Sequence, residues 1–441
     1  MSYKLNLGVA QGVITPKVGC CLYGYAPDVF SEKVNDDLTA TVYYFTEGDT
    51  RAMIIETTVC AIKQAFCDEI RAEVEKATGV PKEHVIIHAT HTHSGPSLTG
   101  NPGWGGFNEE YAYEIFKPKL LELATEATKN SEPVKMGVAT GESLVGVNRR
   151  ERLEDNTVKL GQNPWGPFNT KMTVVSFKTE SGEIKASMVH YGCHGTAAGR
   201  NHEISRDWPG VMVDAVSEYG GGVCAFFNGP EGDTGPRLMN GRTIGFDEKN
   251  GKSGNIKCAM ELGAYAAHDA LRIFQSTGGY HEAGLEVLST TVKIPVKPRP
   301  TLEEATAEYE QLKEFTVNHR AGSAAYYKRV IDSYEAGVKD VEAYEMEQTI
   351  IRIGDVAFVQ STFELFCEIG LRIQKDSPFP HTLPIVNTNG SDAYFITESE
   401  LCRGGYEVAV FGKRQLQGWV DNGDYYLIKN TLENLRKLKG D

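Results

Sequence analysis

Two histidines one residue apart are the first candidates for chemistry in this chain. His91 and His93 follow an apolar run, in the sequence VIIHATHTHSGP at residues 85–96. Side chains two residues apart share a face of an extended strand, so we expect both imidazoles to point the same way. Neutral imidazole is the commonest protein ligand for metals. The following Ser-Gly-Pro indicates the carboxyl end of a strand, where open α/β sheets hold their ligands. The alternative is an ordinary polar strand end.

Two later segments also place a candidate ligand beside a strand end. A second predicted strand, residues 185–191, stops in glycines around His194. Glu364 follows a predicted hairpin that ends at residue 360, and it precedes an apolar helix over 365–374. A glutamate at that junction is either a first-turn acid favoured by the helix dipole or a ligand held at the strand end.

Other polar residues near strand ends are expected to support a site rather than to form it. His190 and His202 are interpreted as structural histidines. Asp233 is interpreted as a residue that shapes the Gly/Pro/Asp loop at 228–236. After a strand, such a loop either presents backbone N–H groups to an anion or is an ordinary sharp turn.

Length and composition restrict the class of protein. A chain of 441 residues with 41% apolar residues and 46 glycines fits a loop-rich α/β enzyme. The net charge is −14 without any basic block, which argues against nucleic acid as a partner. No stretch reaches the ~20 apolar residues of a membrane span, and the N-terminus lacks a signal-peptide pattern. Nine scattered cysteines without a CxxC pair indicate reduced thiols. We therefore expect a cytoplasmic protein without a membrane anchor.

Strand and helix patterns predict an α/β fold, with a mixed β-sheet core, flanking helices and a metal site at the carboxyl ends of strands. Residues 51–93 show the strand–helix–strand order of a parallel sheet. A charged helical insertion is predicted at 301–345, after a proline-containing linker. Further strands are predicted at 382–387, 393–397 and 408–412. We expect residues 1–441 to form a single domain.

Taken together, these segments resemble the catalytic region of the neutral (non-lysosomal) ceramidase family, in a short single-domain bacterial type. The most specific match is THTHSGP at residues 90–96, which agrees with the family motif as it stands. Further matches are CHGT at 193–196, Asn148-Arg149, Phe363-Glu364-Leu365, and the spacing of Tyr394 and Tyr406. The resemblance runs from residue 15 almost to the C-terminus.

The resemblance implies one zinc ion per chain, with four protein ligands and an open position for water. The implied ligands are His91, His194, Glu364 and Tyr394. Two histidines and a glutamate from separate strand ends are also a ligand set common in zinc hydrolases. Tyr394 rests on the resemblance alone, and the alternative is a pocket tyrosine that hydrogen-bonds the water.

The same resemblance implies that His93, Arg149 and Tyr406 face the substrate. The chemistry would be attack of a metal-activated water on an amide carbonyl. His93 would move the proton from the water to the leaving amine, and the other two would stabilise the oxyanion. For Arg149 the alternative is a surface charge in a basic run.

Three departures from the family pattern bear on the substrate. Gly235 stands where the family carries a serine, so a serine nucleophile is not available there. We also expect the chain to consist of the catalytic region alone, without the family's C-terminal Ig-like domain and without a secretion signal. We therefore expect a small soluble N-acyl or cyclic amide, selected by loops at 20–27, 101–107 and 234–242, rather than membrane ceramide.

The sequence leaves several alternatives open. These are a ceramidase proper, a metal-dependent esterase or lactonase that uses the same site, and a binding protein that keeps its metal without catalysis. A homo-oligomer is equally compatible with the sequence.

Overall fold

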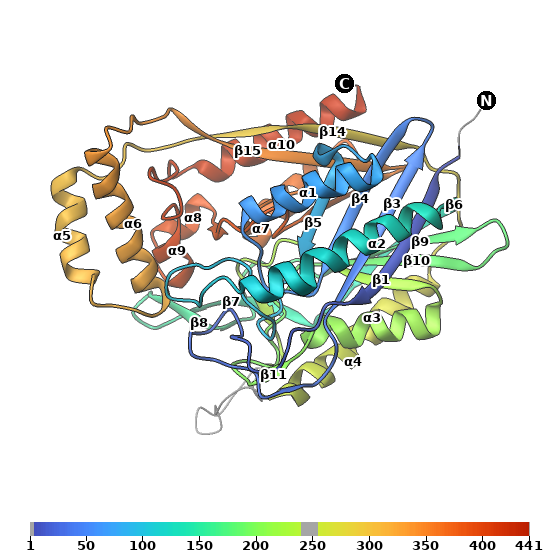
Figure 1. The fold of residues 1–441 in the computed structure, drawn as a ribbon, viewed down its shortest axis with the longest axis horizontal. Coiled ribbons are helices and arrows are strands. Elements are labelled where there is room, and N and C mark those ends of the chain that lie inside the picture. The colour runs from blue at the N-terminus through green and yellow to red at the C-terminus, as the bar shows by residue number, and fades with distance from the viewer. Residues whose placement is uncertain (1–3, 240–254, 441) are drawn as a thin grey trace.

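Two β-sheets packed face to face form the core, and helices cover both outer faces (Figure 1). This is a computed structural model, and it describes residues 4–239 and 255–440. The end of the predicted substrate loop at 234–242 lies outside the described residues. Among those described, no helix combines the length and apolar character that crossing a membrane requires.

The larger sheet has eight strands in the order β12-β10-β9-β6-β1-β3-β4-β5. Its strands are β1 (Asn6–Val13), β3 (Thr39–Glu47), β4 (Thr50–Thr57), β5 (Val85–Ala89), β6 (Glu132–Glu142), β9 (Lys171–Thr179), β10 (Ile184–Tyr191) and β12 (Val223–Asn228). The β4–β5 and β10–β12 pairs are parallel, and the other pairs in this sheet are antiparallel. The predicted mixed sheet is therefore confirmed.

The smaller sheet has the order β14-β15-β16-β18. Its strands are β14 (Leu285–Pro295), β15 (Ala343–Ile353), β16 (Val356–Gln360) and β18 (His381–Ile385). Strand residues alternate between two apolar layers. Tyr43 and Phe45 of the larger sheet face the smaller one, whereas Val42 and Tyr44 face the helices. Burial of each such large apolar side chain contributes about 1.5–3 kcal/mol.

Helices on the outer faces follow from apolar residues at helical spacing. The larger sheet is covered by α1 (Gln64–Thr78), α2 (Lys117–Lys129), α3 (Asp207–Gly220) and α4 (Ile256–Gln275). The smaller sheet is covered by α7 (Cys367–Asp376) and α10 (Gly423–Lys439). In α1, Phe66, Ile70 and Val74 are buried, which places one face of the helix against the sheet.

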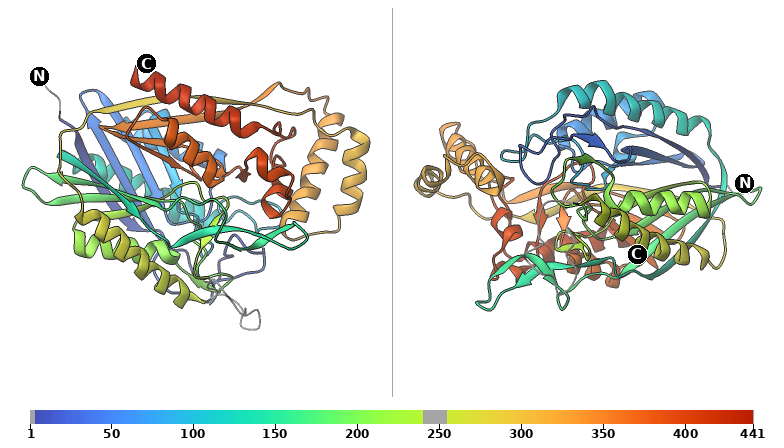
Figure 2. Two further views of the ribbon diagram at one scale, coloured as in Figure 1. Left: turned by 180° about the vertical axis from the view of Figure 1, so that it is seen from behind. Right: turned by 90° about the horizontal axis from the view of Figure 1, so that it is seen from below.

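Two helices project beyond the layers, as Figures 1 and 2 show. They are α5 (Leu302–Leu312) and α6 (Asn318–Glu335), within the charged segment predicted at 301–345. A capping box between Thr301 and Glu304 begins α5.

One predicted strand is wrong. Residues 408–412 were expected to extend, but α9 (Tyr406–Val410) is a short helix. A brief apolar run does not distinguish a strand from a buried helical turn. Here Gly405 adopts a φ of 95°, which turns the chain into the helix.

Candidate metal centre and substrate cavity

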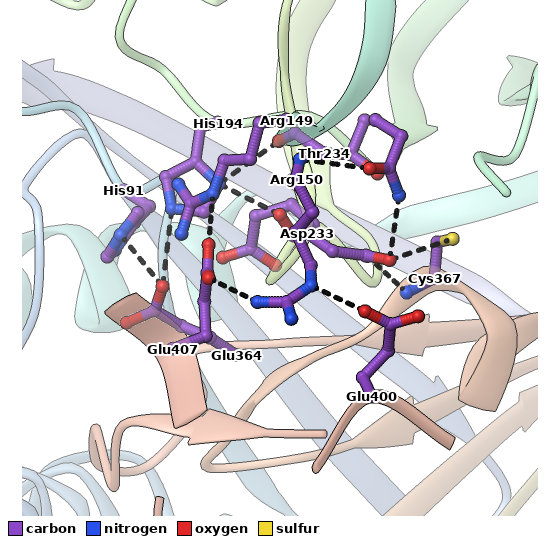
Figure 3. Close-up of polar contacts among 12 residues, drawn as sticks. His91, Arg149, Arg150, His194, Asp233, Thr234, Glu364, Cys367, Glu400 and Glu407 are labelled. Carbon is purple, nitrogen blue, oxygen red and sulfur yellow. Dashed lines mark hydrogen bonds and ion pairs between the residues drawn. The ribbon is translucent and has the colours of Figure 1, made fainter. Parts of the chain in front are cut away.

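Three of the predicted ligands converge in the interior, as Figure 3 shows. The Nε2 atom of His91 lies 3.4 Å from Oε2 of Glu364, and Nε2 of His194 lies 3.3 Å from the same oxygen. All three side chains are buried. His91 and His194 follow the carboxyl ends of β5 and β10, and Glu364 lies in the short strand β17 (Glu364–Leu365). The larger sheet therefore supplies the two histidines, and the separate β17–β19 pair supplies the glutamate.

The two histidines of the HTH motif come together in a way that the sequence did not predict. Strand β5 ends at Ala89, and His91 adopts a left-handed φ of 69°, so the expected strand alternation does not apply. His93 is instead held by its backbone N–H, which donates to the carbonyl of Gly195 over 3.3 Å. Its Nε2 atom lies 3.3 Å from Nε2 of His91.

Backbone carbonyls fix the tautomers of the two ligand histidines. Nδ1 of His91 donates to the carbonyl of Cys60 over 2.8 Å, and Nδ1 of His194 donates to that of Glu231 over 2.9 Å. The lone pair of each Nε2 then faces the carboxylate of Glu364. Metal-binding histidines almost always anchor their second nitrogen in this way.

The polar atoms at the point of convergence fit a metal ion. Nε2 of His194 and Oε2 of Glu364 are buried, and neither has a hydrogen-bond partner among the described residues. Two acceptors that face each other without a donor from the described residues are unfavourable, because each buried unsatisfied polar group costs about 1–3 kcal/mol. A cation bound by His91, His194 and Glu364 would satisfy both of them.

The charge states of these groups also suit a metal. Burial, with a smaller effect of Arg149, lowers the pKa of His194 to about 3, so its imidazole is neutral. Burial alone would raise the pKa of Glu364, but His91 and His194 hold it well below its usual value. Neutral imidazole and ionised carboxylate are the forms that bind a metal. His91 differs, because Cys60 and Glu364 outweigh burial and raise its pKa well above the usual value, so a metal would displace a proton from this ring.

Glu231 also faces this cluster, and sequence reasoning missed it. One carboxylate oxygen of Glu231 lies within 4.8 Å of the ligand atoms of His91, His194 and Glu364. Its Oε1 accepts a 2.8 Å hydrogen bond from Asn387, whereas Oε2 is buried without a partner among the residues described. Burial raises the pKa of Glu231 to about 8. The signal that could have located Glu231 is its distance from a strand end. Glu231 lies three residues after the end of β12, just as His194 lies three residues after the end of β10.

Cys60 lies near the same histidines. Its Sγ atom is 3.7 Å from Nδ1 of His91. Cys60, His91 and His93 together form a second group of side chains whose potential metal-ligand atoms lie close to one another. Burial raises the pKa of the Cys60 thiol, which keeps it protonated and therefore a poor metal ligand.

Tyr394 stands next to Glu364. It begins the strand β19 (Tyr394–Phe395), which pairs with β17 in parallel with Glu364 opposite Tyr394. Its ring stacks near that of His194, with centroids 6.5 Å apart. Burial raises the pKa of Tyr394 well above its ordinary value, so its phenol is neutral.

Arg149 lies on β7 (Gly146–Arg152) and points into the cluster, not to the surface. Its Nε donates to Glu407 over 2.9 Å, and its guanidinium carbon lies 5.2 Å above the ring of Tyr394. Its Nη2 atom is buried and has no partner in the described part of the chain. Glu407 also accepts a 2.7 Å bond from Arg150, so one carboxylate orients two arginines. Sequence reasoning missed this role of Glu407.

Comparison with known proteins identifies the fold. No family model matches the chain. Neutral ceramidases A and B of Dictyostelium discoideum are 23% and 24% identical over 307 and 306 residues, which is 63% of this chain. The match covers 42% of each relative, so the chain spans about two fifths of their length. The structure of neutral ceramidase from Pseudomonas aeruginosa superposes with a TM-score of 0.74 at 17% identity, over 100% of this chain and 75% of that one.

The chain has the neutral ceramidase fold and resembles neutral ceramidases in sequence. A ceramidase structure complexed with C2 matches equally well, with a TM-score of 0.74, 17% identity, and coverage of 99% of this chain and 76% of that one. The resemblance and the fold class predicted from the sequence are therefore confirmed.

In this neutral-ceramidase-like fold, a cavity of about 320 Å³ opens from the cluster. His91, His93, Glu364 and Tyr394 line one part of it, and Tyr406 and His319 line another. The predicted loops at 20–27 and 101–107 both contribute, through Tyr23, Gly24, Asn101, Pro102 and Trp104. Among the predicted substrate-facing residues, His93 and Tyr406 are cavity-lining.

Asp233 lies behind the cluster. Its Oδ1 accepts a 2.7 Å hydrogen bond from the backbone N–H of Cys367, and Oδ2 accepts a 3.2 Å bond from the side chain of Asn148. These bonds join the loop after β12 to the first residue of α7 and to β7. His190 donates to the carbonyl of Pro384 over 2.8 Å, and His202 contacts the carbonyl of Phe30 over 2.8 Å.

Proposed function

We propose that this chain is a zinc-dependent hydrolase that cleaves the carbon–nitrogen amide bond of a small N-acyl or cyclic amide. The observation that carries the proposal is the buried convergence of two imidazole Nε2 atoms on the Glu364 carboxylate, beside a cavity. The matched relatives are named ceramidases, and ceramide is itself an N-acyl amide.

The metal would be held by His91, His194 and Glu364, with Tyr394 as a fourth ligand. Imidazole nitrogen and carboxylate oxygen are the donors that zinc takes in hydrolases, and the absence of thiolate among them is typical of catalytic sites. When bound, such a metal supplies Lewis acidity to a carbonyl and lowers the pKa of water.

His93 is the proposed proton carrier. Burial, together with the neighbouring His91 and His194, lowers its pKa well below the usual value, so the imidazole is neutral and able to accept a proton. Its Nδ1 has no hydrogen-bond partner among the described residues, unlike Nδ1 of the two ligand histidines. The ring therefore takes a proton from water at one nitrogen and delivers one to the leaving amine.

Arg149 and Tyr406 are the proposed donors to the developing oxyanion. The buried Nη2 atom of Arg149 has no hydrogen-bond partner in the part of the chain that the structure describes, and Glu407 fixes the guanidinium in position. Burial raises the pKa of Tyr406, which keeps its hydroxyl protonated and able to donate. Donors held in place in a site shielded from water are the most effective stabilisers of such charge.

A cavity of about 320 Å³ supports a small substrate, because it lies at the lower end of the usual range for small-molecule sites. A soluble substrate and a cytoplasmic location are parts of the proposal. They rest on the acidic composition and the scattered cysteines.

The test compares N-octanoyl amides, the matching octanoyl esters and ceramide in detergent, with zinc-loaded protein. We expect the short amides to be cleaved faster than ceramide. Faster cleavage of ceramide would favour a ceramidase proper, and cleavage of the esters alone would favour an esterase. Binding of all three without cleavage would reject the hydrolase.

A further inference from the structure

Four cationic side chains line the same cavity. Arg329 comes from α6, Lys413 and Arg414 come from the segment after α9, and Lys63 precedes α1. Arg329 donates through Nη2 to the carbonyls of Lys413 and Arg414, over 3.0 and 3.4 Å. Three of the four cations are therefore gathered on one side, which we call the cationic wall (Arg329, Lys413 and Arg414).

No described carboxylate lies within ion-pair distance of these charges, although Glu308 lies close enough to Lys413 to raise its pKa against the effect of burial. Within residues 4–239 and 255–440, neither the cationic wall nor Lys63 forms an ion pair, in contrast to Arg149 and Arg150. Lys413 Nζ donates instead to the hydroxyl of Ser323 over 3.2 Å, and the Lys63 ammonium lies 3.6 Å from the centre of the Phe107 ring.

The one further carboxylate that lines the cavity is already engaged. Asp392 accepts a 2.6 Å hydrogen bond from the hydroxyl of Tyr344 and a 3.3 Å bond from Thr362.

Burial lowers the pKa of Lys413, and burial together with Arg414 lowers the pKa of Arg329. The wall is thus a local concentration of positive charge in a protein whose net charge is −14.

A cavity wall that carries one sign of charge attracts ligand groups of the opposite sign. We propose that the cationic wall binds an anionic group of the substrate, a carboxylate or a phosphate, at a distance from the amide bond. This inference rests on the proposed function and narrows its substrate class to N-acyl amino acids or N-acylated amino phosphates. Guanidinium groups suit this role, since their paired N–H donors match carboxylate and phosphate geometry.

The test uses three amides that share the octanoyl chain and differ in the group beyond the amide nitrogen, which is a carboxylate, a phosphate or a neutral hydroxyl. These are N-octanoylglycine, N-octanoylethanolamine phosphate and neutral N-octanoylethanolamine. We compare zinc-loaded wild type with the double variant Lys413→Gln/Arg414→Gln. KM for the anionic amides should rise about 10- to 100-fold, as expected for lost charge-assisted hydrogen bonds. The kcat values and the KM for the neutral amide should change little.

The control variant is Lys328→Gln. Lys328 neighbours Arg329 on α6 and is exposed, but it does not line the cavity. It should leave all three KM values unchanged. Thermal unfolding of each variant shows whether the fold is retained, and if the double variant is unfolded, Lys413→Gln alone replaces it.

Calorimetric binding of N-octanoylglycine separates this inference from the proposed function. If no amide is cleaved but the anion binds to wild type and not to the double variant, the hydrolase fails and the anion site stands. Preference for the glycine or the phosphate compound assigns the carboxylate or the phosphate. The inference is overturned if the neutral amide is preferred, or if the double variant keeps wild-type KM and affinity for both anions.

Discussion

The metal-ligand cluster and the cationic wall line one cavity, yet their polar atoms are satisfied in different ways. Around the cluster, backbone carbonyls hold His91 and His194, and Glu407 orients Arg149. In the wall, Lys413 has one hydroxyl partner, and no described carboxylate pairs with it or with the two arginines. The cluster lies just beyond the ends of β5 and β10 and in β17, whereas the wall is built by α6 and the segment after α9. If both proposals hold, core strands position the reacting groups and peripheral elements select the substrate.

The largest effect is expected from replacing His93 with alanine. If His93 carries the proton, kcat should fall about 10²- to 10⁴-fold while zinc content stays the same. Steady-state kinetics and metal analysis of the same sample measure both. A matching loss of zinc would instead make His93 a ligand.

Arg149→Gln should lower kcat about 10²- to 10³-fold, because a donor to the oxyanion is lost. The fold should survive, since Glu407 keeps its 2.7 Å bond from Arg150. Kinetics on N-octanoyl amides and thermal unfolding provide the measurements. A rise in KM with kcat unchanged would place Arg149 with the cationic wall instead of the reaction centre.

Gly24→Ala tests how closely His93 must be held. A Cβ atom on Gly24 would lie 2.3 Å from Nδ1 of His93, and Gly24 has a φ of 115°. Displacement of the ring should lower kcat about tenfold without loss of zinc, consistent with the effect of a small misplacement. Gly19→Ala is the matched control, because Gly19 has a φ of 96° but no atom within 4 Å of its Cβ position. Equal effects would mean that backbone strain, not His93, is responsible.

The smallest effect is expected from salt. Raising ionic strength from 0.05 to 0.5 M should increase KM for an anionic amide several-fold, because partly exposed charges are screened. The kcat value and the KM for the neutral amide should be nearly constant. A salt effect of equal size on the neutral amide would show that it does not arise at the cationic wall.

Local sequence patterns predicted many of the strands and helices. The strand–helix–strand unit at 51–93 is present as β4, α1 and β5, since its apolar spacing follows the layers that bury it. His194 and Glu364 were located because each stands beside a strand end. The shared direction of His91 and His93 was predicted from strand geometry, but it depends on a left-handed residue.

The remaining site residues depend on contacts between distant segments. Glu407 meets Arg149 across 258 positions, and Asn387 meets Glu231 across 156. Lys413 and Arg329 come from two segments that carry no common motif. Hydrophobic periodicity within a segment does not indicate which distant segments come into contact. The cationic wall was therefore absent from the sequence-based prediction.

The metal content of purified, dialysed protein tests the central claim most directly, with Glu364→Ala beside wild type and Glu368→Ala as the control. Glu368 lies four residues further on and pairs with Arg372, so its loss should not affect the cluster. About one zinc per chain in wild type and in Glu368→Ala, with none in Glu364→Ala, is the predicted result. A metal-free wild type, or zinc retained in Glu364→Ala, would contradict the proposed ligand set.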